Sequence, residues 1–112
     1  MSKELITFDE YVAATSKLEI RIGQIIGAEP VPKSSGLKLT VVFGEEEVKT
    51  AFTNLGKTHQ PEEFIGLACP FVMNLQPSEI KGVLSEVMIM VAEEGFETFL
   101  DSNKYPIGSK LM

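Results

Sequence analysis

The sequence that begins at Leu18 and ends at Ala28 reads Leu-Glu-Ile-Arg-Ile-Gly-Gln-Ile-Ile-Gly-Ala. In its first half, apolar residues alternate with Glu19 and Arg21, and this two-residue period predicts a half-buried β-strand. Gly23 lies where the alternation changes phase, as at a β-bulge or a sharp bend. A long strand bent at a glycine is what a small closed barrel needs in order to turn a corner.

The residues on either side of this strand predict one short helix and several more strands. Thr7 and Glu10 have the spacing of a capping box, so a helix is expected over residues 8–14. Alternating or continuous apolar runs predict strands at residues 37–43, 48–53, 67–75 and 87–92, and a short one around 96–100. Strands at such short spacing, with little helix, predict a small all-β barrel or sandwich.

The length and composition indicate one globular domain without a cofactor or metal. The chain has 112 residues, of which 44% are hydrophobic and 23% are charged. Its single cysteine, Cys69, and single histidine, His59, form neither an internal disulfide nor a cluster of soft metal ligands. No apolar stretch near the N-terminus has signal-peptide length, and none is long enough to span a bilayer. A reducing, cytoplasmic location without membrane contact is therefore expected.

The charge is acidic in total but uneven along the chain. Ten basic and sixteen acidic residues give a net charge of −6, which by itself opposes nonspecific binding of polyanions. Two stretches, residues 30–44 and 48–60, contain no acidic residue and carry Lys33, Lys38, Lys49 and Lys57. If folding brings these stretches together, they form a local positive face; the alternative is a set of scattered surface lysines.

The sequence contains no catalytic motif. There is no glycine-rich phosphate loop, no nucleophile elbow and no His-Glu-x-x-His pattern. His59 lies in a polar segment, as surface histidines usually do, and the paired acids Glu62-Glu63 and Glu93-Glu94 fit solvated turns. We therefore expect that the protein is not an enzyme.

The segment from Asn74 to Met88, here called the signature segment, is the best candidate for a binding site. It combines an amide, an ammonium group on Lys81 beside the flexible Gly82, the hydroxyl of Ser85 and the thioether of Met88. Such groups hydrogen-bond to and stack against unpaired bases. The residues alone leave open the alternative of an ordinary turn followed by a core methionine.

The signature segment resembles the motif of the tRNA-binding domain family. Asn74, Leu75, Pro77, Lys81, Gly82, Ser85 and Met88 match that motif in place. Residues 18–25 are similar to the family's opening strand, and weaker matches extend the resemblance over nearly the whole chain. The chain departs from the pattern at Glu79, where relatives often have a basic residue, and in the loop 32–36, which lacks their Asp-Lys pair.

The resemblance implies a fold and an assembly. The family fold is an OB-fold, a five-stranded Greek-key barrel, so residues 17–100 are expected to form the barrel of a single 112-residue domain. Residues 1–16 then form a helical N-terminal extension and residues 101–112 a C-terminal tail. In stand-alone family members the extensions pair two barrels, which implies a homodimer with interface residues Phe8, Tyr11, Val12, Tyr105 and Ile107.

The resemblance also implies a function, the binding of tRNA by shape and phosphate contacts without catalysis. The RNA-binding residues would be Lys33, Lys38, Lys49, Lys57, Asn74, Lys81, Gly82, Ser85 and Met88. The family includes the CsaA proteins, so the alternative function is chaperone-like binding of unfolded or exported polypeptides. A third reading is a dimerisation module that holds an aminoacyl-tRNA synthetase.

Overall fold

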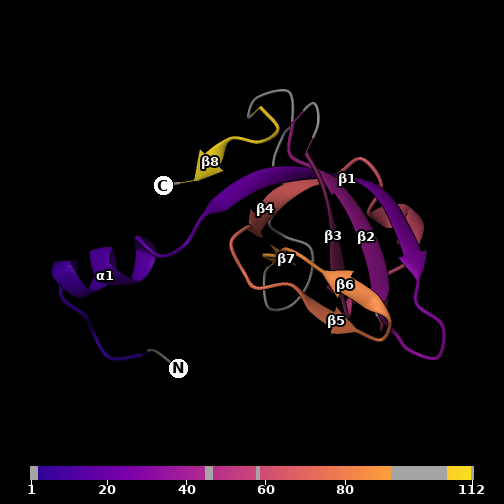
Figure 1. The fold of residues 1–112 in the computed structure, drawn as a ribbon, viewed down its shortest axis with the longest axis horizontal. Helices are drawn as coiled ribbons and strands as arrows, with labels where there is room; N and C mark the ends of the chain where they lie inside the picture. The colour runs from indigo at the N-terminus through magenta and orange to yellow at the C-terminus, as the bar shows by residue number, and fades with distance from the viewer. Residues whose placement is uncertain (1–2, 45–46, 58, 92–105, 112) are drawn as a thin grey trace.

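The structure is a computed structural model that describes residues 3–44, 47–57, 59–91 and 106–111. One helix is followed by strands and two short 3₁₀ turns, as Figure 1 shows. The elements are α1 (Phe8–Thr15), β1 (Ile20–Pro30), β2 (Leu37–Val42), β3 (Val48–Thr53), η1 (Leu55–Lys57), η2 (Pro61–Glu63), β4 (Ala68–Val72), β5 (Ser78–Ile80), β6 (Val83–Ser85), β7 (Met88–Ile89) and β8 (Lys110–Leu111).

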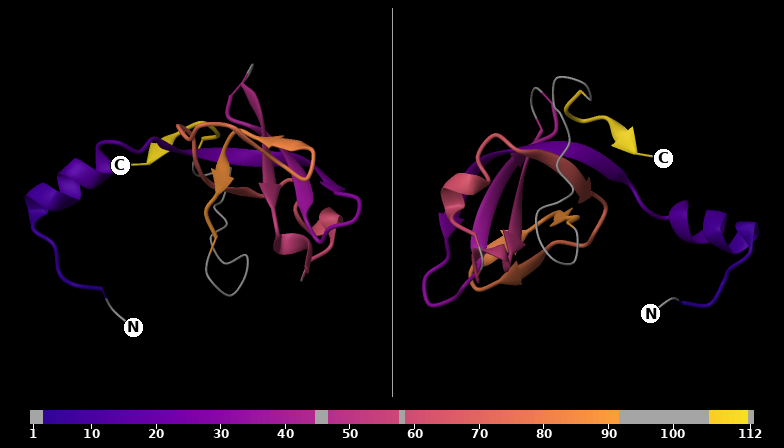
Figure 2. Two further views of the ribbon diagram at one scale, coloured as in Figure 1. Left: turned by 60° about the horizontal axis from the view of Figure 1, so that its bottom comes forward. Right: turned by 180° about the vertical axis from the view of Figure 1, so that it is seen from behind.

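The main sheet has the antiparallel order β3-β2-β1-β4-β7, with β8 paired to the start of β1. The segment after β6 brings the two edges of this sheet together. Glu86 N–H donates to the Thr50 carbonyl on β3, and two residues further on Met88 pairs with Val72 on β4. The strands therefore form a nearly closed barrel, visible in Figure 2, and the predicted all-β, OB-like class is confirmed.

The core of the barrel is built by alternation along β2 and its neighbours. Leu37, Leu39 and Val41 are buried, whereas the residues between them are only partly buried. Two aromatic residues from different strands, Phe43 and Phe71, meet edge to face inside the barrel with ring centroids 5.4 Å apart. Polar residues therefore project outward from β2 and β3, and this outer face is free to carry a site.

The strand predicted at β1 is confirmed, and Ile22 is buried as the alternation indicates. Gly23 is buried as well, because strand register places it opposite the buried Cys69. A side chain at Gly23 would collide with Phe43, which explains the glycine as a close approach. The register shift lies between Ile25 and Gly27 instead, with the extra residue Ile26 exposed.

Arg21 joins three parts of the chain at one end of the barrel. Its guanidinium donates to the carbonyl oxygens of Gly108 and Phe43, each at 3.0 Å, and to a carboxylate oxygen of Glu47 at 2.6 Å. It also lies 5.8 Å from the centroid of the Phe43 ring. The single arginine therefore holds the C-terminal segment against β1 and the β2–β3 connection.

Helix α1 has the predicted position and the predicted cap. Glu10 N–H donates to the Thr7 hydroxyl at 3.1 Å, and Thr7 N–H donates to the Glu10 carboxylate at 3.0 Å. None of its residues is buried, and Figures 1 and 2 show the helix standing away from the barrel. We call residues 3–18 the arm. The strand expected around residues 96–100 lies outside the described residues.

Candidate nucleic-acid interface

The signature segment folds into a two-stranded hairpin on the barrel. β5 and β6 pair antiparallel, with Ile80 opposite Val83, so that Lys81 and Gly82 alone form the turn. Both turn residues have positive φ, 53° at Lys81 and 86° at Gly82, as a type I′ hairpin turn requires. Gly82 takes this conformation without strain, whereas Lys81 is held in a region that side chains disfavour. The lysine ammonium is thereby presented at an exposed tip.

Asn74 attaches the beginning of the signature segment to the end of the arm. Its side-chain oxygen accepts from Glu19 N–H at 2.9 Å, and its amide nitrogen donates to the Lys17 carbonyl at 2.7 Å. Met73 N–H donates to the Glu19 carbonyl beside it. The amide predicted to meet RNA therefore has two backbone partners in this structure.

Ser85 attaches the other end of the hairpin to β3. Its hydroxyl accepts from Phe52 N–H and donates to the Val87 carbonyl, both at 3.2 Å. The next residue, Glu86, accepts from Thr50 N–H at 3.0 Å. These two side-chain hydrogen bonds and the backbone bond from Glu86 N–H to the Thr50 carbonyl therefore join this segment to the edge of β3.

Met88 is exposed and does not belong to the core. Its side chain is 57% exposed, and Leu84 on β6 is 51% exposed. The buried residue of this region is Val87. The alternative reading of Met88 as a core methionine is therefore wrong, because register places Val87 inward and Met88 outward.

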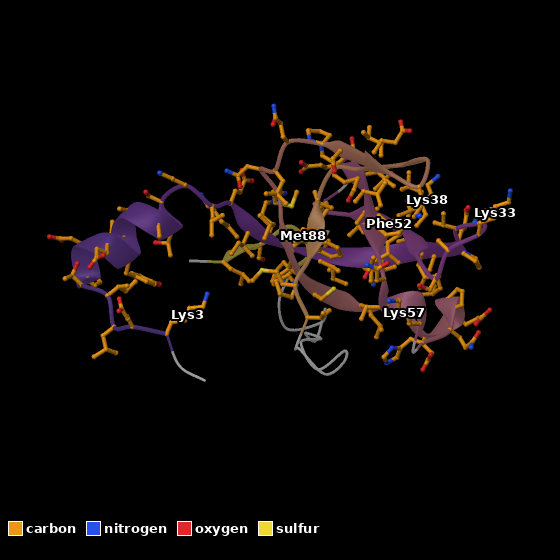
Figure 3. All side chains as sticks on the ribbon, turned by 90° about the horizontal axis from the view of Figure 1, so that it is seen from below. Lys3, Lys33, Lys38, Phe52, Lys57 and Met88 are labelled. Carbon is orange, nitrogen blue, oxygen red and sulfur yellow. The ribbon has the colours of Figure 1, made fainter. Side chains whose placement is uncertain are left out.

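The predicted phosphate-contacting lysines do not all lie on one face. Lys38 projects from the outer face of β2, opposite Phe52, and Lys33 lies in the β1–β2 loop. Lys57 ends η1, and Figure 3 places Lys33, Lys38 and Lys57 toward the same end of the barrel. Lys49 is paired with the buried Val41, so it lies on the opposite face of β3 from Phe52 and Lys38. Three of the four lysines therefore lie toward one end of the barrel in this view.

Carboxylates moderate the charge of this surface. Glu29 is the cross-strand neighbour of Lys38 on β1, and Glu79 is exposed on β5 two residues before Lys81. Each places a negative charge near one of the predicted cations. The positive charge of this surface is therefore partly offset by neighbouring carboxylates.

The sequence reading missed Phe52, the aromatic residue on the outer face of β3. It is partly buried, and a Cβ atom on Gly36 would overlap its ring, so the ring covers the glycine of the β1–β2 loop. The sequence alone does not reveal this position, because Ala51 and Thr53 are the buried residues of β3 although Phe52 is the more apolar residue.

Among the described residues, no group of three or more His, Cys, Asp or Glu side chains is placed to hold a metal ion. Cys69 is buried, and loss of solvation raises the pKa of its thiol to about 12. It therefore remains a neutral core residue at ordinary pH. None of the helices described is long and apolar enough to cross a membrane.

The arm carries an apolar surface beside the C-terminal segment. A groove of about 450 Å³ separates the two, here called the arm groove. It is lined by Tyr11, Val12, Thr15, Ser16, Leu18, Ile20, Lys110 and Leu111. Of the predicted interface residues, Phe8, Tyr11 and Val12 are exposed and Ile107 is partly buried. Tyr105 lies outside the described residues.

A nearly closed barrel with lysines on its outer strands and loops belongs to the class of OB-like binding domains. Residues 20–108 match the protein family described as "Putative tRNA binding domain". The chain therefore belongs to this family, and the resemblance found in the signature segment is confirmed.

The relatives found by sequence are much longer proteins. The chain is 44% identical over 89 residues to a methionine–tRNA ligase of Methanococcoides burtonii, which covers 79% of the chain and 12% of that ligase. It is 39% identical over 93 residues to the corresponding ligase of Cytophaga hutchinsonii, covering 82% of the chain and 13% of the ligase. The chain thus spans only a small part of these relatives.

Solved structures of similar size share the whole fold. A MetRS-related protein from Pyrococcus horikoshii superimposes with a TM-score of 0.79 at 29% identity, covering 98% of this chain and all (100%) of that one. The chaperone CsaA of Bacillus anthracis gives a TM-score of 0.74 at 25% identity, covering 97% and 100%. Both similarities extend over the arm as well as the barrel.

Proposed function

We propose that this chain is a non-catalytic tRNA-binding module that recognises the shape of the folded RNA through its phosphates. The observation that carries the proposal is the position of Lys33, Lys38 and Lys57 toward one end of a barrel that belongs to the tRNA-binding domain family. Phosphate contacts position an RNA without reading its sequence. Because tRNA is a cytoplasmic ligand, we place the activity in the cytoplasm.

The proposed site divides into contacting and positioning residues. Lys33, Lys38 and Lys57 contact phosphates, and Lys49 contributes less because it lies on the other face of β3. Lys81 and Met88 meet unstacked bases or sugars from the hairpin and the start of β7. Asn74, Gly82 and Ser85 act in the same site by holding the hairpin in place, since they provide its turn and its attachments.

We propose a homodimer in which the arm of each copy packs on the other. α1 has eight residues and none is buried, although Phe8, Tyr11 and Val12 are apolar and exposed. A helix this short is only marginally stable without tertiary packing. Burial of its apolar side chains contributes about 25 cal/mol of stabilising free energy per Å². A second copy fits because the arm groove beside α1 is apolar and each copy supplies both a helix and a groove.

The dimer is tested by sedimentation equilibrium at micromolar concentration. The wild-type chain should have twice its 12.3 kDa mass. Val12→Asp, which places a charge in the arm groove, should give a folded monomer, whereas Asp9→Asn on the same helix should remain dimeric. A monomeric wild-type protein would contradict the proposal.

The alternative function, binding of unfolded polypeptide, is favoured by a specific surface. Leu84, Met88 and Met90 are exposed on β6, β7 and the residue after β7. Flexible methionines suit surfaces that accept varied apolar partners. The protein also resembles the chaperone CsaA over nearly its whole length. A synthetase is a further proposed partner, since the sequence relatives are methionine–tRNA ligases.

The experiment that tests the tRNA proposal is a fluorescence anisotropy titration with labelled bulk tRNA at several salt concentrations. Affinity should fall with salt, and Lys38→Ala should reduce the slope of log K against log salt by roughly one unit. Lys3→Ala is the matched control, because Figure 3 places Lys3 on the arm, away from the other labelled lysines. Equal slopes for wild type and Lys38→Ala would count against the site.

A parallel aggregation assay separates the two functions. The protein is added to a chemically unfolded substrate protein while light scattering is followed, with and without tRNA. Suppressed scattering without any tRNA affinity would favour the polypeptide reading. Salt-sensitive tRNA binding without suppression would favour the RNA reading.

A further inference from the structure

The outer face of β2 and β3 holds one aromatic side chain, Phe52, among polar and small neighbours. Its cross-strand partner is Lys38, and the residues of the same face further along the two strands are Thr40 and Thr50. Among the described residues, Phe52 has no ring partner, unlike Phe43 and Phe71 in the core. Val42 and Val48 end this face, so an aromatic ring lies beside a cation at one end of it.

The position of the Phe52 ring is held on two sides. Beneath it lies Gly36, which is buried and whose missing side chain makes room for the ring. The backbone of Phe52 is attached through its N–H to the Ser85 hydroxyl, the group that also fastens the β5–β6 hairpin. The ring therefore has a fixed place between the β1–β2 loop and the signature segment.

A small hollow adjoins this ring on the loop side. Its volume is about 190 Å³, and it is lined by Pro30, Ser34, Ser35, Gly36, Leu37, Gly56, His59, Gln60 and Pro61. Gly36 lines the hollow and also lies under Phe52, so the ring and the hollow are neighbours of the same glycine. The volume is below the roughly 300 Å³ at which pockets begin to enclose whole ligands, so it suits one base or one sugar.

We propose that Phe52 is a base-stacking platform and that this hollow receives the neighbouring nucleotide, which together form a subsite for two consecutive unpaired nucleotides. This inference rests on the proposed function and adds a ligand class to it, single-stranded RNA within the tRNA. Lys38 beside the ring neutralises the phosphate that joins the two nucleotides. Stacking on an aromatic ring is tolerant of sequence, since every base has a π-face.

A simpler role for Phe52 is to shield Gly36 and hold the loop. Leucine would shield the glycine almost as well but offers no π-face, so Phe52→Leu separates the two roles. Truncating a stacking aromatic weakens binding by about 1–3 kcal/mol per base, which corresponds to roughly 5- to 150-fold in affinity. A shielding role predicts an unchanged affinity in Phe52→Leu.

The chain contains no tryptophan, so Phe52→Trp introduces a single fluorescent reporter at the proposed platform. Titration with a short unstructured oligoribonucleotide, and with bulk tRNA, should quench this tryptophan as a base stacks on it. Val48→Trp is the matched control, because Val48 lies on the same face at the other end of β3. Its fluorescence should change little. Circular dichroism establishes that each variant is folded.

The outcomes distinguish this inference from the function on which it rests. Quenching in Phe52→Trp, together with roughly 5-fold or greater weakening in Phe52→Leu, supports the subsite. If wild type binds tRNA with salt sensitivity but Phe52→Leu binds equally well, the subsite is refuted and the tRNA function stands. If wild type binds neither RNA, both are refuted. Quenching in Val48→Trp as strong as in Phe52→Trp would also overturn the assignment.

Discussion

The barrel and the arm of this protein differ in how far they bury their apolar side chains. In β2 every second residue is buried within the same chain, whereas in α1 no residue is buried. Both elements have well-formed local structure, since α1 has a complete capping box. The difference shows that local sequence signals suffice to form a helix. Whether the apolar side chains of that helix become buried within the same chain depends on tertiary packing.

The largest expected effect comes from truncating an aromatic residue in each region. Phe71→Ala, at a fully buried site in the barrel, should lower the free energy of unfolding by about 3–5 kcal/mol. Phe8→Ala, at a site that is 75% exposed, should leave the unfolding of the isolated chain nearly unchanged. Urea denaturation at low protein concentration measures both. Similar losses in the two variants would abolish the contrast between barrel and arm.

A second test concerns Arg21, which connects the C-terminal segment to the barrel. Arg21→Met keeps much of the apolar stem but removes donors to Gly108, Phe43 and Glu47. The side chain is 21% exposed, so we expect a loss of about 2–4 kcal/mol. Thermal unfolding measures it. Hydrogen exchange should also become faster at the Gly108 amide, which is bonded to Ile22. Unchanged exchange there would show that the segment is held by other contacts.

A smaller effect is expected at Asn74, where the arm meets the signature segment. Asn74→Ala removes two exposed hydrogen bonds, so the loss of stability should be about 1 kcal/mol. The sharper readout is faster hydrogen exchange at the Glu19 amide, which donates to the Asn74 side chain. Gln76→Ala in the same exposed loop is the control. If Asn74→Ala weakens tRNA binding while Glu19 exchange is unchanged, Asn74 contacts the RNA directly.

The smallest effect is a pH dependence confined to the arm. Hydrogen bonds from the Thr7 backbone and then the Thr7 hydroxyl hold the pKa of Glu10 below its ordinary value of 4.5. A lowered carboxyl pKa stabilises the folded arm at pH values above the pKa of the same group in the unfolded chain. This stabilisation is lost as the pH falls through the lowered pKa of the folded arm. The NMR shift of the Thr7 amide should therefore titrate below pH 4.5. In Glu10→Gln this titration should disappear.

The sequence predicted well the elements whose signals are local. The helix over 8–14 was found at Phe8–Thr15, and the strand at residues 48–53 coincides with β3. The β5–β6 hairpin with its Lys81-Gly82 turn was not predicted, because its strands are only three residues long. Alternation in β1 predicted the strand and the burial of Ile22 but placed the irregularity at Gly23, whereas the register shifts at Ile26.

The candidate site was predicted only in part, for reasons that lie in the sheet register. The chain order of lysines does not reveal that Lys38 and Lys49 lie on opposite faces of the sheet, because that depends on how β2 and β3 pair. The sequence also does not reveal that the side chains of Asn74 and Ser85 accept hydrogen bonds from backbone N–H groups 55 and 33 residues away. Residues 92–105, including Tyr105, lie outside the described structure, so that part of the prediction stays a prediction.

By itself, the sequence determined the family, the β-rich class, the capped helix and the signature segment, because each depends on residue order and short-range stereochemistry. The tertiary structure alone decided which lysines lie toward the same end of the barrel, that Phe52 lies on the outer face beside Lys38, and that no residue of α1 is buried. These properties depend on strand pairing and packing between residues far apart in the sequence, for which one-dimensional periodicity carries no information.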